Sequence, residues 1–95
     1  MEFDKIVHQS TRLQILSYLH PREKATFNDL KEDLELTEGN LASHLKKLEE
    51  AEYVEVEKKF VDRKPQTTYI ITGKGKKALE DHVQKLEGII EMTEG

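Results

Sequence analysis

The chain of 95 residues contains no cysteine, no tryptophan and only two prolines. The lack of cysteine excludes disulfides, thiolate metal sites, iron–sulfur clusters and thiol nucleophiles. Long apolar runs are also missing, since the longest covers residues 69–71 and a membrane-spanning helix needs roughly 18 residues. The first residues carry acids and no apolar stretch, so we expect neither a secretory signal nor a transit peptide. These absences predict a cytoplasmic protein with no membrane partner.

The length of 95 residues allows one domain, so residues 1–95 are treated as a single unit. Residues 73–78 fit the dinucleotide fingerprint G-x-G-x-x-A only superficially, because neither a parallel βαβ unit nor a ribose-binding acid accompanies them. No arrangement of hydroxyl, imidazole and carboxylate groups suggests catalysis. The histidines are too dispersed to indicate one metal site: His8, His20, His44 and His82. The sequence therefore predicts a protein that is not an enzyme and has no metal or cofactor.

The formal net charge of -4 disfavours a nucleic-acid partner at first sight, because DNA binding depends on neutralising phosphates. The charge is unevenly distributed, however. Residues 1–52 carry 7 Lys and Arg against 11 Asp and Glu, and residues 78–95 carry 1 against 5. Residues 53–77 carry 7 against 3, so this segment is a candidate contact surface. The acidic remainder should repel DNA from the other faces.

The first half of the chain shows the apolar spacing of helices. A stripe over residues 13–19 predicts a core helix with Ser10 as a plausible N-cap, which His20-Pro21 should stop because proline cannot continue a helix. Thr26 is a candidate N-cap for a second helix of about two turns. Thr37 is a candidate N-cap for a third helix, which runs to about Ala51 and buries Leu41, Leu45 and Leu48.

The spacing changes after residue 52. Two runs of β-branched and aromatic residues, 54–60 and 67–71, predict a two-stranded hairpin over about residues 53–71. Residues 61–66 are expected to form an exposed loop whose tip is stiffened by Pro65.

The second and third helices, over about residues 26–51, match a helix-turn-helix, in which the second helix enters the major groove. One side of the third helix carries hydrogen-bonding side chains that suit base edges or phosphates. Gly39 leaves room for the backbone to approach DNA. A solvated surface helix would also be polar, so that alternative stays open. The candidate DNA contacts here are Thr37, Gly39, Asn40, Ser43, His44 and Lys47.

The hairpin is expected to add basic contacts at its tip. A twisted basic hairpin can lie along the DNA backbone and insert Arg63 into a narrow minor groove. Lysines and a proline on an exposed strand also prevent edge-to-edge aggregation, and the two roles are compatible. The candidate wing contacts are Lys58, Lys59, Arg63 and Lys64.

A final helix over about residues 72–92, capped by Thr72, carries apolar residues at heptad spacing: Leu79, Val83, Leu86 and Ile90. A helix from a second copy is the simplest cover for this seam. Packing against the first helix of the same chain is the alternative. Dimerisation would also place two recognition helices about one DNA turn apart, roughly 34–36 Å.

Four segments together resemble a known family. They are Thr11-Arg12-Leu13-x-Ile15-Leu16, Thr26-Phe27-x-x-Leu30, Leu36-Thr37-Glu38-Gly39-Asn40-Leu41-x-x-His44-Leu45-x-x-Leu48-Glu49 and Lys64-Pro65-x-Thr67-x-Tyr69-x-x-Thr72-x-x-Gly75. In order and spacing they resemble single-domain winged-helix transcriptional regulators of the ArsR/MarR-like group, over about residues 4–90.

This resemblance implies a mainly helical α+β fold with three helices, a two-stranded wing and a long C-terminal dimerisation helix. It further implies a homodimer, with the helix beginning at Thr37 as recognition helix and the terminal segments, including Phe3 and Ile6, as dimer contacts. The cysteine ligands of thiolate-dependent metal sensors in the group are absent. The group usually has glycine where this chain has Glu52, so Glu52 must adopt a left-handed conformation or the helix must end differently.

The sequence therefore predicts a homodimeric regulator that binds pseudo-palindromic double-stranded DNA in a sequence-specific manner and represses by occupying a promoter. The alternative is a winged helix that binds a protein partner through its acidic ends and makes no specific DNA contact. No residue identifies a small-molecule effector.

Overall fold

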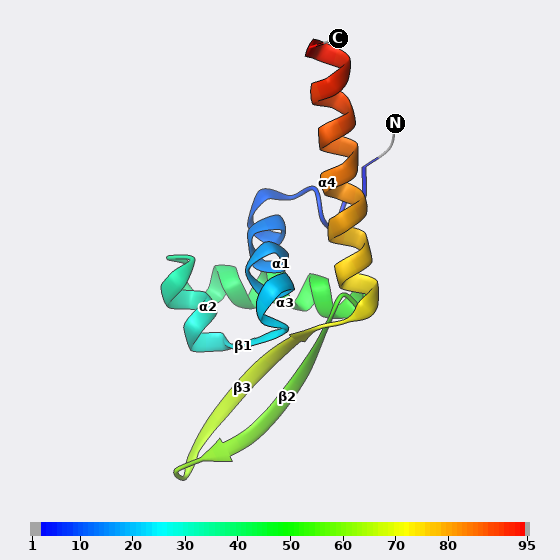
Figure 1. Ribbon diagram of the computed structural model, residues 1–95. Coiled ribbons are helices and arrows are strands. Elements are labelled where there is room, and N and C mark those ends of the chain that lie inside the picture. Colours follow the sequence, from blue (N-terminus) through cyan, green and yellow to red (C-terminus); the bar gives the residue numbers. More distant parts are fainter. Residues whose placement is uncertain (1–2, 95) are drawn as a thin grey trace.

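The computed structural model describes residues 3–94 and confirms the expected architecture, with one additional strand (Figure 1). Four helices and three strands follow one another in the order α1 (Ser10–Arg22), β1 (Lys24–Thr26), α2 (Phe27–Asp33), α3 (Glu38–Glu50), β2 (Val54–Val61), β3 (Lys64–Ile71) and α4 (Gly73–Glu94). No helix within residues 3–94 combines the length and the apolar character needed to cross a bilayer.

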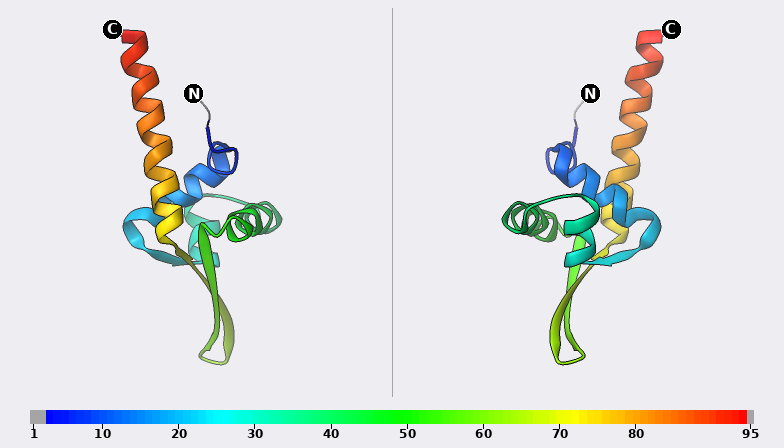
Figure 2. Two further views of the ribbon diagram at one scale, coloured as in Figure 1. Left: turned by 90° about the vertical axis from the view of Figure 1, so that its right-hand side faces the viewer. Right: turned by 90° about the vertical axis from the view of Figure 1, so that its left-hand side faces the viewer.

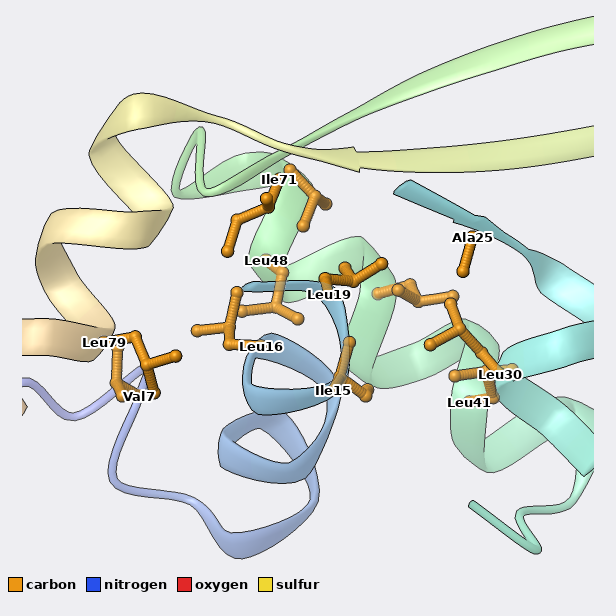
Figure 3. Close-up of a cluster of buried hydrophobic side chains, with 12 residues drawn as sticks. Val7, Ile15, Leu16, Leu19, Ala25, Leu30, Leu41, Leu48, Ile71 and Leu79 are labelled. Atoms are coloured by element: carbon orange, nitrogen blue, oxygen red, sulfur yellow. The ribbon is translucent and has the colours of Figure 1, made fainter. Parts of the chain in front are cut away.

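The core forms where the apolar stripes of α1, α2 and α3 converge, as the leucine spacing predicts (Figure 3). Strand β2 closes it through Val54, β3 through Ile71, and α4 through Leu79. Removing these side chains from water is the main driving force that holds the three helices together. The largest side chains with almost no exposed surface are Val7, Ile15, Leu16, Leu19, Leu30, Leu41, Leu45, Leu48 and Val54.

The N-caps of α2 and α3 are the predicted threonines. The hydroxyl of Thr26 accepts a hydrogen bond from the Asp29 amide at 3.1 Å, and that of Thr37 accepts one from the Asn40 amide at 3.2 Å. Helix α1 differs from the prediction at its start, because Gln9 and not Ser10 is its N-cap. The Gln9 side chain accepts a hydrogen bond from the Arg12 amide at 2.9 Å. Glutamine is not among the short side chains that usually cap helices, so the sequence did not indicate it.

Pro21 does not stop α1 as predicted, since the helix continues to Arg22. Proline deprives only the Ser17 carbonyl of its intrahelical donor, and Ser17 is exposed, so water can replace that donor. The amide of Glu23 then donates to the Leu19 carbonyl at 2.7 Å and closes the last turn. A proline in the last turn of an exposed helix end is therefore tolerated.

The sheet has three strands in the order β1-β3-β2, not the two expected. Strand β1 pairs antiparallel with β3, with Lys24 opposite Ile70 and Thr26 opposite Thr68. A strand of three residues is too short to show an alternating pattern in the sequence. The hairpin turn is also tighter than predicted, because Lys64 and Pro65 belong to β3.

Only Asp62 and Arg63 form the hairpin turn, with φ of 52° and 68°. Positive φ at both positions is typical of a two-residue type I′ turn, which matches the twist of the strands. The turn therefore fixes the register in which Val61 lies opposite Lys64 and Phe60 opposite Pro65.

Of the two possibilities that the sequence leaves open at the end of α3, Glu52 adopts the left-handed conformation, with a φ of 64°. The Tyr53 amide donates to the Leu48 carbonyl and the Glu52 amide to the Glu49 carbonyl, both at 2.9 Å. This is the hydrogen-bond pattern of a Schellman motif, here formed without glycine. The hairpin therefore leaves α3 directly after the cap.

Two elements project from the helical body in opposite directions, the hairpin on one side and the C-terminal half of α4 on the other (Figure 2). They give the molecule its elongated shape of 57 × 25 × 21 Å. Each projection leaves side chains exposed that a compact domain of this size would bury.

Candidate nucleic-acid interface

Helix α3 presents a polar face on the side opposite its three buried leucines. Asn40, Ser43 and Lys47 are exposed there, and Thr37 and Gly39 are exposed at the start of the helix. Lys46 is exposed as well and extends this surface, although the prediction did not include it. Because Leu41, Leu45 and Leu48 anchor the helix in the core, its polar face is held rigidly and could enter a DNA groove as one unit.

His44 lies at the edge of this face and not at its centre. Its side chain is half-buried, and its Nδ1 is buried without a hydrogen-bond partner among the described residues. Burial, together with the positive charge of Arg12, lowers the pKa of His44 below the usual 6.5. His44 is therefore neutral at neutral pH, and only the rim of its ring could reach a base or a phosphate.

The hairpin carries its positive charge near the tip. Acidic Glu55 and Glu57 lie on β2 nearer to the body, and Lys59 approaches Glu57 with Nζ 3.7 Å from a carboxylate oxygen. Within residues 3–94, no carboxylate lies within ion-pair distance of the other predicted wing cations, which are Lys58, Arg63 and Lys64. These three exposed cations could bind phosphates directly.

The wing lysines divide between the two faces of the hairpin, because side chains alternate along a strand. Lys58 shares one face with Val56 and Phe60, and Lys59 and Lys64 lie on the other. A duplex lying against either face would therefore meet positive charge. The positive φ of Arg63 places its backbone at the very end of the hairpin.

Two apolar side chains stand among these cations at the wing tip. Phe60 is 77% exposed and Val61 is 40% exposed. In the sequence, Phe60 is only the last residue of the apolar run 54–60. Because the hairpin extends past the helices, no other described element can cover it (Figure 1).

The lysines at the start of α4 have partners within the chain. Lys76 Nζ lies 2.6 Å from a carboxylate oxygen of Glu23, and Lys74 Nζ lies 3.5 Å from one of Glu52. The Thr72 hydroxyl caps the helix by accepting from the Gly75 amide at 3.0 Å. The positive charge of residues 53–77 is therefore most available for binding phosphates at the wing tip, and less so at the start of α4.

The predicted partner-binding seam on α4 is only partly available to a second copy. Leu79 is buried in the core of its own chain, which corrects its assignment to the dimer surface. Val83 is 41% and Ile90 54% exposed, and Leu86 is half-buried. The same part of α4 also exposes Ile89 and Met92, which the heptad spacing missed.

Between α1 and α4 lies an open groove of about 580 Å³. Its lining includes Pro21 from α1 and Leu79 and Val83 from α4. The groove makes the exposed apolar side of α4 continuous with α1.

The N-terminal segment packs against the first half of α4. Phe3 stacks on His8 with ring centroids 4.8 Å apart and meets the edge of His82 at 5.4 Å. Ile6 is half-buried against the core. Of the predicted dimer residues, Phe3 and Ile6 thus already contact their own chain and could offer only part of their surface to a partner.

His82 on α4 is only 2% exposed. The N-terminal segment covers it, and sequence spacing within α4 alone cannot reveal that cover. Burial, followed by the charges of His8 and Lys85, lowers the pKa of His82 below 6.5, although Asp4 opposes the shift.

Asp4 fixes this segment by accepting hydrogen bonds from the Ile6 amide and the Tyr53 hydroxyl. Burial raises the pKa of Asp4, but these hydrogen bonds, together with one from the Val7 amide and the charge of Lys85, outweigh it and the net pKa falls. Burial and the bond to Asp4 raise the pKa of Tyr53 to about 12. Asp4 and Tyr53 therefore stay ionised and protonated respectively at neutral pH.

Residues 3–94 contain no cluster of three or more His, Asp or Glu side chains that could hold a metal ion. The structure offers two surfaces suited to binding, a polar helix face and a basic hairpin.

Known proteins share this architecture. An uncharacterized protein of Methanocaldococcus jannaschii is 42% identical over 82 residues, which cover 86% of this chain and 89% of that protein. The solved structure of a transcriptional regulator homologue from Pyrococcus horikoshii OT3 matches with a TM-score of 0.88 and 35% identity, over 93% of this chain and 87% of that one. AbfR, solved in an overoxidized form bound to DNA, matches in fold with a TM-score of 0.75 and 22% identity, over 95% of this chain and 75% of that one.

Residues 11–90 match the family described as the winged helix DNA-binding domain. This match covers α1, the helix-turn-helix formed by α2 and α3, the hairpin and most of α4. The chain therefore belongs to the winged-helix DNA-binding family of transcriptional regulators, which are not enzymes.

Proposed function

We propose that the protein is a homodimeric transcriptional regulator that binds a pseudo-palindromic site in double-stranded DNA and represses by occupying a promoter. The single observation that carries this proposal is the pairing of a rigid polar helix face with an extended basic hairpin. The face consists of Asn40, Ser43 and Lys47, and the hairpin carries Lys58, Arg63 and Lys64 at its tip.

The two parts would divide the work of recognition. Asn40 can form a bidentate pair with adenine, and Ser43 can reach base acceptors or phosphates. Lys47 and the missed Lys46 are placed to bind phosphate or guanine, whereas the wing cations supply binding that does not depend on sequence. Thr37 and Gly39 would let the start of α3 approach the DNA backbone closely.

A homodimer is supported by the exposed apolar side chains of α4. Val83 lines the groove between α1 and α4, and Ile90 lies about two turns further along α4; this chain leaves both partly in water. A second copy of α4 would cover them and would place two copies of α3 on one duplex. The protein would act in the cytoplasm. Repression follows as the simplest effect, since a bound dimer blocks the DNA that it covers.

Fluorescence anisotropy with labelled promoter DNA tests the proposal. Binding should weaken steeply as salt increases, because counterions return to the phosphates. Asn40→Ala should relax the preference for one sequence, and Lys64→Ala should weaken binding to all sequences alike. His44→Ala, at the edge of the face, is expected to have the smaller effect on specificity. Equal affinity for promoter and random DNA, or a flat salt response, would contradict specific regulation.

The alternative, a winged helix that binds only a basic protein partner, makes the opposite prediction. The protein would then fail to bind any duplex even at low salt, and neutralising the wing cations would change nothing.

A further inference from the structure

The wing tip combines two properties that rarely occur together on a free surface. Phe60 leaves 77% of its surface in water, yet exposed cations surround it. Positive charge alone would serve for phosphate binding, so a large aromatic ring at this position calls for a different explanation. A partner that fits must be anionic on its outside and apolar just beneath.

The register of the hairpin shows which way Phe60 faces. Side chains alternate along β2, so Phe60 lies on the same face as Val56, and its partner across the hairpin is Pro65. Val56 in turn lies opposite Tyr69, whose ring centroid is 6.4 Å from that of Phe27 on α2. The face that carries Phe60 is thus the one that meets the helices at the base of the hairpin.

Phe60 lies four residues beyond Val56, or about 13 Å further along the strand. At that distance the hairpin has passed the helical body, as both views show (Figure 2). A duplex held against α3 would therefore extend beneath the tip of the wing. Lys58 lies on the same face and Arg63 lies in the turn, so both are placed to hold its phosphates.

We propose that Phe60, supported from behind by Pro65, is an apolar wedge that inserts from the minor groove between two base pairs at the edge of the bound site. Stacked base pairs are apolar and lie between two rows of phosphates, so DNA matches both properties of the tip. The insertion unstacks one step and kinks the duplex. This inference rests on the proposed DNA binding and adds a residue that determines DNA shape and step preference.

The wedge predicts a sequence preference without a base contact. Pyrimidine–purine steps such as TA and CA unstack most easily, so one of them should occur under each wing. The selected site should then contain a flexible step outside the bases that α3 contacts.

Two measurements on the full chain test the wedge. Energy transfer between dyes at the ends of a bound duplex reports the bend, and 2-aminopurine beside the flanking step reports unstacking by brighter fluorescence. Phe60→Ala should abolish both signals and weaken binding about tenfold, since burial of a phenyl ring is lost. Phe60→Leu should keep most of the bend, because leucine is also an effective wedge.

Val61→Ala is the matched control. It removes an exposed apolar side chain from the neighbouring position on the opposite face of the same strand, and it should leave the bend and the 2-aminopurine signal unchanged. Circular dichroism and thermal unfolding of all three variants check that the hairpin still forms. A variant that loses the hairpin would also lose the salt dependence contributed by the wing cations, which Phe60→Ala should retain.

The outcomes separate the wedge from the function on which it rests. A wild-type complex that forms without bending or unstacking DNA overturns the wedge and leaves DNA binding intact. So does an equal response of Phe60→Ala and Val61→Ala, or a Phe60→Ala variant that changes only self-association. If the wild-type protein binds no duplex at all, the proposed function itself is wrong and the wedge falls with it.

Discussion

The hairpin and the C-terminal half of α4 leave the same small body in opposite directions, but their surfaces differ in charge and in apolar character. The outer part of the hairpin, from Lys58 to Lys64, has four cations and one acid, whereas residues 78–95 have one cation and five acids. The hairpin exposes its apolar side chains at a tip crowded with charge. Helix α4 exposes its apolar side chains over several turns.

The net charge of -4 therefore does not indicate which partner this protein binds, because the charge is unevenly distributed. The acidic projection would be repelled by phosphates and the basic one attracted, so the molecule should dock on DNA in a single orientation. The apolar side of α4 would then face away from DNA, where a second copy can reach it.

The largest effect is expected from charging the apolar side of α4. In the double variant Val83→Glu and Ile90→Glu, two partly exposed side chains change, so each protomer should stay folded while the dimer dissociates. Without the second half-site, DNA affinity should fall on the order of 100-fold. Light scattering coupled to gel filtration would measure the mass, and anisotropy would measure the affinity.

Glu91→Gln, on the same part of α4, is the control for a change of charge alone and should leave the mass unchanged. A wild-type protein that is monomeric at micromolar concentration would contradict the assignment of self-association to α4.

The next largest effect is on folding stability, and it should differ in sign between glycines at the two ends of α4, Gly75 and Gly88. A Cβ on Gly75 would lie 2.2 Å from the Tyr53 carbonyl oxygen, so Gly75→Ala must displace the junction of hairpin and helix. We expect a loss of about 1–3 kcal/mol in the free energy of unfolding. Gly88→Ala meets nothing within 4 Å and should instead stabilise the helix by roughly 0.5–1 kcal/mol. Urea denaturation of both variants would show whether the signs are opposite.

Features that depend on neighbouring residues in the chain could be predicted from the sequence. The leucine stripes and the threonine caps of α2 and α3 were predicted, because helical spacing and capping are local. The missing glycine left two possibilities at Glu52, a left-handed conformation or a different helix end, and the structure shows the first. These local signals were enough to predict the helix-turn-helix and the position of the wing.

What the sequence could not show depends on contacts between distant segments. Strand β1 exists only because β3 pairs with it, and His82 is buried only because the N-terminal segment covers it. Leu79 was assigned to a partner, but its spacing within α4 cannot tell a dimer seam from contact with the chain's own core. Phe60 is exposed because the hairpin extends past the helices, and the apolar run 54–60 does not show how far the strands project.

A smaller effect concerns the charge of the hairpin. Lys58→Ala combined with Lys64→Ala removes two cations that face no ion-pair partner among residues 3–94. The slope of log affinity against log salt should fall by about 0.9 for each lost phosphate contact. Lys76→Ala is a matched control, because that lysine is already paired with Glu23 and should leave the slope nearly unchanged. Equal slopes for both would show that the hairpin is merely solvated.

The smallest expected effect is the loss of folding stability at acidic pH through His82. Burial, followed by the charges of His8 and Lys85, holds the pKa of His82 below 6.5, so the folded state binds this proton more weakly than the unfolded state. The contribution of His82 to folding stability is therefore complete above pH 6.5 and decreases as the pH falls toward the lowered pKa. Urea titrations between about pH 7.5 and 5 should show stability falling with pH, and His82→Gln should reduce that dependence. An unchanged dependence would mean that the N-terminal segment does not cover His82 in solution.

The central claim is that two copies of this chain read one DNA site, with α3 in the grooves and the wings outside. In vitro selection from a random duplex library with purified protein tests it most directly. We expect an inverted repeat whose half-site centres are about 10–10.5 base pairs apart, or a multiple of that spacing. A single unpaired half-site, or no enriched sequence, would contradict it.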